Sequence, residues 1–333
     1  MRPRFHPRLI NGPFEDPGLY VPFLFENRAI LFDAGDIYSL SHKDILKISH
    51  VFITHTHMDH FIGFDRLLRF FLGREKQLYL YGPEGFLKNA EGKLAGYAWN
   101  LVNNFNYKLC LYLTEVYPDY VISRAYTCQN KFLPTQKTVK GPFNGVLYEE
   151  PAFHVSAVML DHSIPCLGLA LKEQFHINIK KDGLENLGLE PGPWLNEFKQ
   201  ALYDQKDVGS EFEVKFGRDR LKKQRFVLGE LAKQIALITP GQKIAYIADV
   251  VSNTSNEEKI ISLAKDADHL FIEAAFLDKD RKIATQKYHL TARQAGDLAA
   301  RAGAKQFSIF HFSPRYLGQE SLLYQEASEA YKS

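Results

Sequence analysis

The sequence predicts an α/β protein with a site at the ends of buried strands, and three observations support this. Several short apolar runs end abruptly in a polar residue, as strands covered on both faces do. Segments with helical spacing of apolar residues lie between these runs, and such alternation indicates α/β layering. Of the 333 residues, 45% are hydrophobic and 24% are charged, which suffices to bury a large core.

Four apolar runs are interpreted as strands because each is followed by a polar side chain. They are Ala29–Phe32 before Asp33, Val51–Ile53 before Thr54-His55, Lys243–Ile247 before Ala248-Asp249, and Phe307–Phe310 before His311. Buried strands aligned in this way would bring those side chains to the same edge of one sheet. We therefore expect a single site that is built from strand ends.

Two segments carry the signals of helices. Phe61–Phe71 has apolar residues three and four positions apart, and Gly73 supplies a stop after it. Ala292–Ala302 follows Thr291, which forms with Gln294 the T-x-x-Q capping box of a helix start. Helices at these places complete the α/β alternation.

The stretch from 172 to 230 interrupts this alternation. It is rich in glycine, proline and charged residues, which is typical of a protruding segment rather than of a core. Within it, Val214–Arg225 has six Lys or Arg against one Asp, so the segment carries a local basic patch. We expect one domain over residues 1–333, with an inserted arm at about 172–230.

Charge and cysteine content narrow the class of protein. The formal net charge of +2 gives no global positive field, so contact with nucleic acid would require a local patch. Cys110, Cys128 and Cys166 lack C-x-x-C spacing, which argues against a disulfide framework and against a thiolate metal site. Because no signal peptide and no long uncharged apolar run is found, we expect a cytoplasmic protein that does not cross a membrane.

Three histidines and one aspartate gather at the end of the second predicted strand, where His55, His57, Asp59 and His60 form an H-x-H-x-D-H cluster. Two imidazoles two residues apart in an extended segment point the same way, so His55 and His57 can share one metal. The turn after them directs Asp59 and His60 towards a second metal. Imidazole and carboxylate ligands favour zinc, although manganese or iron can occupy the same set.

Two metals need more ligands than four residues supply. The candidates at other strand ends are His162, Asp249 and His311. Asp249 could bridge both ions, with His162 completing the first site and His311 the second. Taken singly, each is more typical of a structural His or a turn Asp, and the cluster makes ligation the better interpretation. Asp33 either supports a ligand through a hydrogen bond or forms a plain turn.

Four segments occur together and in a fixed order. They are His55-Thr-His-Met-Asp-His60, Asp161-His-Ser-Ile-Pro-Cys-Leu-Gly168, Ala245-Tyr-Ile-Ala-Asp249 and His311-Phe-Ser-Pro-Arg-Tyr316. In this order and context they resemble ribonuclease Z, the tRNA 3′-processing endonuclease family of the metallo-β-lactamase superfamily. Leu187-Gly-Leu-Glu-Pro-Gly-Pro-Trp194 resembles the glycine-proline motif in that family's tRNA-clasping arm. The resemblance implies a metallo-β-lactamase αββα sandwich with an inserted arm.

The resemblance also implies a role for each candidate residue. It makes His55, His57 and His162 ligands of one zinc, Asp59, His60 and His311 ligands of the other, and Asp249 the bridge between the two Zn²⁺ ions. Asp59 would also accept a proton from the attacking water. His289 would protonate the leaving 3′-oxygen, with Glu273 orienting it. Without the resemblance, His289 would be interpreted as a helix-entry residue and Glu273 as a surface charge.

The implied substrate is precursor tRNA, cut after its acceptor stem to leave a 3′-hydroxyl on the tRNA. The arm would grip the RNA through phosphate contacts, which weaken with salt. The candidate RNA-binding residues are Arg315, Lys215, Arg218, Arg220, Lys222, Lys223 and Arg225. Arg315 could hold a phosphate bidentately or be a surface arginine. The resemblance further implies a homodimer.

Departures from the family pattern keep two alternatives open. Arg8-Leu-Ile-Asn-Gly12 replaces the usual Gly-Thr-Ser or Gly-Thr-Gly, Ala248-Asp-Val250 replaces Gly-Asp-Thr, and Ile272 replaces the His before the Glu. The first alternative is a hydrolase of the same fold that acts on a small phosphodiester, ester or lactone. The second is a binding protein with a structural metal site, which fits the sequence less well because structural zinc sites leave no open position.

Overall fold

The computed structural model describes residues 3–24, 26–134, 137–217 and 222–333, and these divide into two compact units. The larger unit comprises Phe5–Leu147, Val155–Leu171 and Lys243–Ser333. The smaller unit comprises Tyr148–His154 and Lys172–Gln242, with the N-terminal residues up to Arg4. The stretch expected to form an arm lies within the smaller unit, whose last residue is Gln242. That the chain is one domain with an insertion stays a prediction.

The first sheet of the larger unit has eight strands in chain order. They are β1 (Arg8–Leu9), β2 (Leu19–Pro22), β3 (Ala29–Phe32), β4 (Ile48–Phe52), β5 (Lys76–Pro83), β6 (Leu109–Val116), β7 (Tyr120–Thr127) and β8 (Val139–Pro142). The strands from β3 to β6 run parallel, and their side chains share one apolar core with the helices α3 (Phe64–Phe71) and α4 (Phe86–Ala95). The short helix α1 (His42–Lys47) joins β3 to β4.

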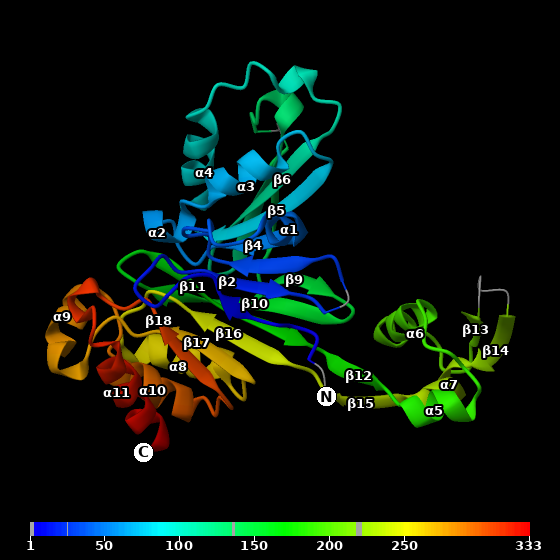
Figure 1. Ribbon diagram of the computed structural model, residues 1–333. Helices are drawn as coiled ribbons and strands as arrows, with labels where there is room; N and C mark the ends of the chain where they lie inside the picture. The colour runs from blue at the N-terminus through cyan, green and yellow to red at the C-terminus, as the bar shows by residue number, and fades with distance from the viewer. Residues whose placement is uncertain (1–2, 25, 135–136, 218–221) are drawn as a thin grey trace. The chain divides into compact units, whose positions relative to one another are not determined.

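The second sheet has six strands in the order β18-β17-β16-β11-β10-β9. They are β9 (Val146–Glu150), β10 (Phe153–Asp161), β11 (Pro165–Glu173), β16 (Lys243–Ile247), β17 (His269–Glu273) and β18 (Phe307–Phe310). Buried residues of this sheet form a second core with α8 (Thr254–Ala264), α10 (Ala292–Arg301) and α11 (Glu320–Lys332). The helix α9 (Arg281–Gln286) follows β17, and Figure 1 shows α8, α10 and α11 on the face of this sheet that points away from the first sheet.

The two sheets lie face to face between their helices, which makes an αββα sandwich (Figure 1). Tyr246 on β16 contacts the other sheet, because its ring stacks on Phe32 of β3 at 5.9 Å, while within its own sheet it stacks on Phe310 of β18 at 5.2 Å. The four predicted strands are confirmed, but the expectation that they share one sheet is wrong. β3 and β4 belong to the first sheet and β16 and β18 to the second. Their ends nevertheless meet, because the sheets are stacked.

The predicted helices are present with one correction. The capping box of Thr291 and Gln294 opens α10, and Gly73 follows α3 with a φ of 80°. The helix expected over 61–71 is instead split into α2 (Met58–Phe61) and α3. Gly63 lies at the break, where a Cβ would come within 2.3 Å of the Gly35 carbonyl oxygen. The break therefore lets the turn that carries Asp59 and His60 pack against the loop after β3.

The described residues of the smaller unit contain two antiparallel strand pairs and three helices, besides short parts of β9, β10 and β11. The pairs are β12 (Phe175–Ile179) with β15 (Ala236–Pro240) and β13 (Glu211–Phe216) with β14 (Lys222–Val227), and the helices are α5 (Lys181–Asn186), α6 (Trp194–Tyr203) and α7 (Leu228–Ile235). Trp194 and Phe198 of α6 are buried, and Phe198 contacts Phe212 of β13 edge to face. In the part of the chain that the structure describes, no helix is long and apolar enough to cross a membrane.

Candidate metal centre

The first group of ligand atoms forms where the chain leaves β4. His55 and His57 lie in the extended segment before α2, and their Nε2 and Nδ1 atoms are 2.9 Å apart. Ligand atoms of His55, His57, His162 and Asp249 all lie within 4.8 Å of one another. His162 comes from the turn between β10 and β11, so one group draws on both sheets.

The second group contains Asp59, His60 and His311. Asp59 and His60 lie on α2, and His311 follows β18. Asp59 Oδ2 is 3.6 Å from the Nε2 atoms of both His60 and His311. These two groups have the same members as the two ligand sets that the sequence resemblance implies, with Asp249 placed in the first. That these residues bind metal stays a prediction, which the geometry supports.

Asp249 lies between the two groups and turns one oxygen towards each. Its Oδ2 is 3.7 Å from His55 Nε2 and 3.5 Å from His162 Nε2. Its Oδ1 is 3.4 Å from His60 Nε2 and 3.1 Å from His311 Nε2. A carboxylate placed in this way has the geometry of a bridging ligand.

A buried hydrogen-bond network orients the ring of His60. Of the members of this network, the sequence indicated only Asp33 as a supporting residue. Asp33 Oδ2 lies 2.9 Å from His60 Nδ1 and accepts hydrogen bonds from the hydroxyls of Thr54 at 2.9 Å and Tyr246 at 3.1 Å. The Thr54 amide donates to Asp33 Oδ1 at 2.7 Å. With Nδ1 of His60 engaged by the carboxylate, its Nε2 is left to face Asp249.

Other contacts orient the imidazole rings of His162 and His55. His162 Nδ1 donates to the Tyr288 carbonyl oxygen at 2.7 Å, which leaves Nε2 towards Asp249. His55 Nδ1 lies 3.1 Å from Thr54 Oγ1 and 3.9 Å from Cys166 Sγ. The strand-end position of Thr54 was visible in the sequence, but nothing in the local pattern distinguished it, Tyr246 or Cys166 as neighbours of the site.

Uncommon backbone conformations gather at the centre. Among the residues whose backbone the structure describes, Asp33, Ser163, Tyr288 and His311 have φ between 56° and 62° without being glycine. Asp33 and His311 belong to the site, while Ser163 and Tyr288 adjoin His162 and His289. Left-handed conformations of non-glycine residues cost free energy and persist where the surroundings impose them, as at functional sites.

Burial and charge oppose each other in this cluster. Burial lowers the pKa of His55 far below its usual range. Burial also disfavours protonated His60, but the carboxylates of Asp249 and Asp33 hold its pKa well above the usual value. The His311 and His60 imidazoles outweigh the effect of burial on Asp249 and hold its pKa well below that of an ordinary aspartate. The centre thus keeps the Asp249 carboxylate ionised beside imidazoles, and these are two of the side-chain types that bind zinc.

Two buried polar atoms of the cluster have no hydrogen-bond partner, as expected of atoms that would bind a metal ion. His60 Nε2 and Asp249 Oδ1 are buried and make no hydrogen bond, although they lie at ion-pair distance from each other. Buried polar atoms without a hydrogen bond are uncommon and need a compensating partner. A cation between the two groups would supply it for both atoms.

Glu273 and His289 form a pair beside the candidate metal ligands. Glu273 is fully buried at the end of β17, and both of its carboxylate oxygens lie 3.2 Å from His289 Nδ1. The Val250 amide donates to Glu273 Oε1 at 2.8 Å. Burial disfavours protonated His289, but Glu273 and then Asp249 outweigh it and raise the pKa of His289 to about 9. The structure thus brings together the pair that the resemblance implies, and Glu273 is not the surface charge that its sequence context alone indicates.

The residues predicted to bind RNA lie in two places. Lys215 is on β13, and Lys222, Lys223 and Arg225 are on β14, all exposed in the smaller unit. Arg218 and Arg220 lie outside the described residues. Arg315 follows His311 in the larger unit, with its guanidinium 3.8 Å from Asp280 and over the ring of Phe276. Their role in RNA binding stays a prediction.

Sequence comparisons identify relatives of this chain. A family model described as a beta-lactamase superfamily domain matches residues 230–312. A ribonuclease Z of Deinococcus radiodurans is 30% identical over 290 residues, which are 86% of this chain and 83% of the relative. A ribonuclease Z of Anoxybacillus flavithermus is 31% identical over 296 residues, covering 87% and 78%. The chain belongs to the ribonuclease Z family.

Structural comparisons agree on the fold of this ribonuclease Z family member. The metallo-beta-lactamase fold protein YhfI from Bacillus subtilis superposes with a TM-score of 0.55 at 15% identity, covering 98% of this chain and 95% of that one. A long form RNase Z from yeast superposes with a TM-score of 0.51 at 12% identity, covering 94% and 38%. The chain therefore has the metallo-β-lactamase fold. The family depends on metal, and the His and Asp cluster is where the described residues could hold it.

Proposed function

We propose that this chain is an endoribonuclease that removes the 3′ trailer of precursor tRNA. Two findings together support the proposal. The chain is 30% identical to a ribonuclease Z over 86% of its length, and two groups of possible metal ligands lie around Asp249, beside the His289–Glu273 pair. The reaction would break the bond between phosphorus and the 3′-oxygen, leaving a 3′-hydroxyl on the tRNA and a phosphate on the trailer.

Two zinc ions are the proposed cofactors, and manganese or iron suits the same ligands. His55, His57 and His162 would hold one ion and Asp59, His60 and His311 the other, with Asp249 between them. Two bound cations of this kind supply a nucleophile at neutral pH by lowering the pKa of water, and they neutralise charge on the non-bridging phosphoryl oxygens.

The protein's own groups would move the protons. The Asp59 side chain is 39% exposed, so one carboxylate oxygen can accept the proton of the attacking water. Glu273 occupies the Nδ1 side of His289, whose side chain remains 18% exposed, so its Nε2 can donate to the leaving 3′-oxygen. A pKa of about 9 keeps this imidazole protonated at neutral pH, as a general acid requires.

The hairpin of β13 and β14 is the proposed grip on the RNA body, together with Arg315 in the larger unit. Lys222 and Lys223 are exposed, and the hairpin exposes further cationic side chains at Lys215 and Arg225. Point charges on a hairpin suit phosphates without reading sequence. A homodimer and a cytoplasmic location are further predictions from the sequence, and sedimentation and cell fractionation would test them.

The decisive experiment incubates the purified chain, with its metal content measured, with end-labelled precursor tRNA and separately with bis-p-nitrophenyl phosphate. We expect cleavage of the RNA to a mature 3′-hydroxyl end, and hydrolysis of the small ester at a lower rate. Hydrolysis of the ester without any RNA cleavage would contradict the proposal and favour a small-molecule hydrolase. Metal retention without hydrolysis of either would favour a binding protein.

A further inference from the structure

A stack of one cation and three rings lies on the surface of the larger unit, with its residues on α3, on α1 and in the loop between β3 and α1. The Arg66 guanidinium carbon lies 3.8 Å from the centre of the Tyr38 ring and 4.9 Å from that of Phe70. The ring of His42 lies 4.7 Å from Phe70. We call these four residues, together with Arg69, the stacking surface.

Tyr38 is held outward by a short turn. Its side chain is 72% exposed, whereas Ile37 and Leu40 on either side of it are buried. Its amide donates to Asp36 Oδ1 at 2.7 Å, and the Leu40 amide donates to the Ile37 carbonyl oxygen. An aromatic ring fixed in this way can accept a partner at little cost in conformational entropy. With Arg66 on one face, the rest of the ring is open to solvent.

The cations of the stacking surface are free of carboxylates. Among the described residues, neither Arg66 nor Arg69 forms an ion pair, and the Arg66 Nε is buried without a hydrogen bond. Asp65, which precedes Arg66 in the sequence, pairs with Lys93 instead. An unpaired guanidinium stacked on an aromatic ring is the arrangement that proteins use for nucleotides.

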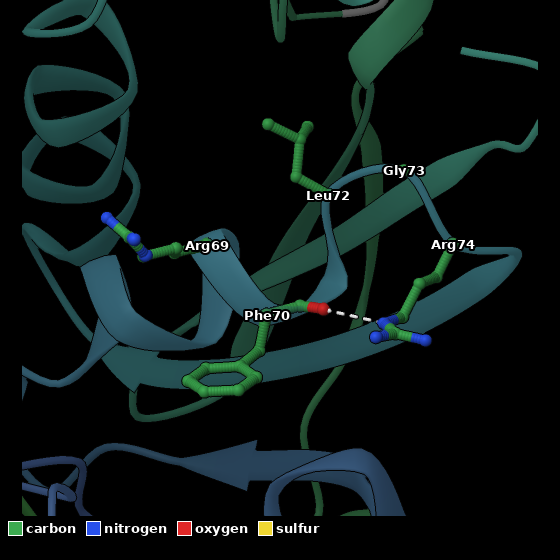
Figure 2. A pocket seen from close by; sticks show the side chains of 5 residues that line it. All are labelled: Arg69, Phe70, Leu72, Gly73 and Arg74. Carbon is green, nitrogen blue, oxygen red and sulfur yellow. Dashed lines mark hydrogen bonds between the residues drawn. The ribbon is translucent and has the colours of Figure 1, made fainter. Parts of the chain in front are cut away.

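A cavity continues this surface past the end of α3. It has a volume of about 440 Å³ and is lined by Arg69, Phe70, Leu72, Gly73 and Arg74. Figure 2 shows Phe70 between the side chains of Arg69 and Arg74, with the Arg74 Nε donating to the Phe70 carbonyl oxygen at 3.0 Å. The cavity thus shares Arg69 and Phe70 with the stacking surface and adds the side chain of Arg74.

The stacking surface is built on the same segments as the metal centre. The Gly35 position packs so closely on the Asp59 carbonyl oxygen that a Cβ there would lie 2.3 Å from it. Arg66 follows His60 by six residues, a length of chain that spans at most ~20 Å. Met58 and Ile62 precede Arg66 at four-residue intervals and are 76% and 42% exposed. The chain between the candidate metal ligands and the stack thus carries exposed apolar side chains at Met58 and Ile62.

We propose that the stacking surface binds an unpaired nucleotide of the RNA, with a base on Tyr38 and its phosphates on Arg66 and Arg69. The proposal rests on the proposed function, since it names a part of the RNA that the same enzyme would hold. Stacking tolerates any base, so this contact adds affinity for single-stranded RNA next to the cut without reading its sequence. It differs from the hairpin of β13 and β14, which offers charge without this stack.

The test measures binding of the full chain to a fluorescent single-stranded oligoribonucleotide and to a matched oligonucleotide with abasic riboses, by anisotropy at fixed salt. Tyr38→Ala should weaken binding of the first by about 5-fold or more, the usual effect of losing one stacked base. The penalty should nearly vanish for the abasic strand, and Tyr38→Phe should bind as the wild type does. The control Tyr107→Ala removes another tyrosine of the larger unit that is 56% exposed, and it should change neither affinity.

Arg66→Ala gives an independent measurement, since it should weaken both strands and lower the slope of log affinity against log salt by about 0.7. Equal penalties of Tyr38→Ala on both strands, or no penalty on either, would overturn the proposal. This test measures binding and not cleavage. If Tyr38→Ala weakened binding only of the strand with bases, but the wild-type chain failed to cut precursor tRNA, only the proposed function would be overturned.

Discussion

The candidate metal centre and the β13–β14 hairpin both gather charged side chains, which are largely buried in the first and exposed in the second. In the centre, Asp249, whose side chain is 4% exposed, lies within 4.0 Å of five imidazoles, and the fully buried Asp33 ties His60 to side chains of both sheets. On the hairpin, Lys215 and Lys223 share Glu213 at 3.6 Å while they stay 51% and 59% exposed. Exposed pairs contribute little, whereas buried groups depend on every partner. Single substitutions should therefore be severe in the centre and small and additive on the hairpin.

Asp249→Asn should have the largest effect, because it removes a carboxylate oxygen from one of the two ligand groups. We expect loss of bound metal and a fall in kcat beyond the ~100-fold that loss of a ligand's hydrogen-bond partner costs. Elemental analysis and turnover of bis-p-nitrophenyl phosphate measure both. Asp119→Asn, at an exposed position of the same unit, is the control. Full metal content with full activity would show that Asp249 is not a ligand.

His289→Ala should lower kcat on RNA by about 10²- to 10⁴-fold, the usual contribution of a general acid. Metal content should stay at the wild-type level, because the proposed ligand sets do not include His289. The comparison needs only metal analysis and single-turnover cleavage. Loss of metal would assign His289 to the ligands instead, in keeping with its place beside Asp249 and His311, and unchanged cleavage would exclude it as the acid.

Glu273→Gln should move the basic limb of the pH profile to lower pH. The folded-state pKa of His289 is raised to about 9, so the acid form persists below that pH and is lost as pH rises through it. Without the Glu273 charge, this pKa should fall towards the ordinary imidazole value of about 6.5. Bound cations would also lower it, so both proteins are compared at equal metal loading. An unmoved basic limb would separate Glu273 from the protonation of His289.

Tyr246→Phe tests the buried network by deleting one hydroxyl. Asp33 would keep His60 and Thr54 but lose the donor from the second sheet, so metal affinity should fall by about 10-fold. Competition with a chelator measures that affinity. Tyr81→Phe, at a nearly buried tyrosine of the first sheet, controls for loss of a hydroxyl as such. Equal metal affinities of the two variants would show that the Tyr246 hydroxyl does not support metal binding and that its ring only packs.

The smallest effect is expected on the hairpin. Lys222→Gln with Lys223→Gln should weaken RNA binding only a few-fold and reduce its salt dependence, since each removes one phosphate contact. The matched pair Lys181→Gln with Lys206→Gln neutralises two other exposed lysines of the smaller unit. If log affinity fell with log salt at the same slope in both double variants, the hairpin would not be part of the RNA interface. A loss as large as that of Asp249→Asn would contradict the contrast drawn above.

Much of the metal centre could be predicted because its signals are local. The two-residue spacing of His55 and His57 places both rings on one side of an extended chain, wherever that chain lies. The apolar runs that become β3, β16 and β18 end one or two residues before Asp33, Asp249 and His311, so their strand-end positions were also visible. The capping box of Thr291 likewise depends only on neighbours in the sequence.

The tertiary structure alone decided which distant residues meet. Tyr246 and Asp33 are 213 positions apart, and their hydrogen bond exists because two sheets stack face to face, which no local periodicity reports. The same stacking explains why strand ends expected on one sheet converge from two. The break at Gly63 arises from close packing on Gly35, and the Arg66 stack arises from the turn that holds Tyr38. Residue types and spacing thus determined the chemistry available to this protein, while long-range packing determined how it is oriented, buried and charged.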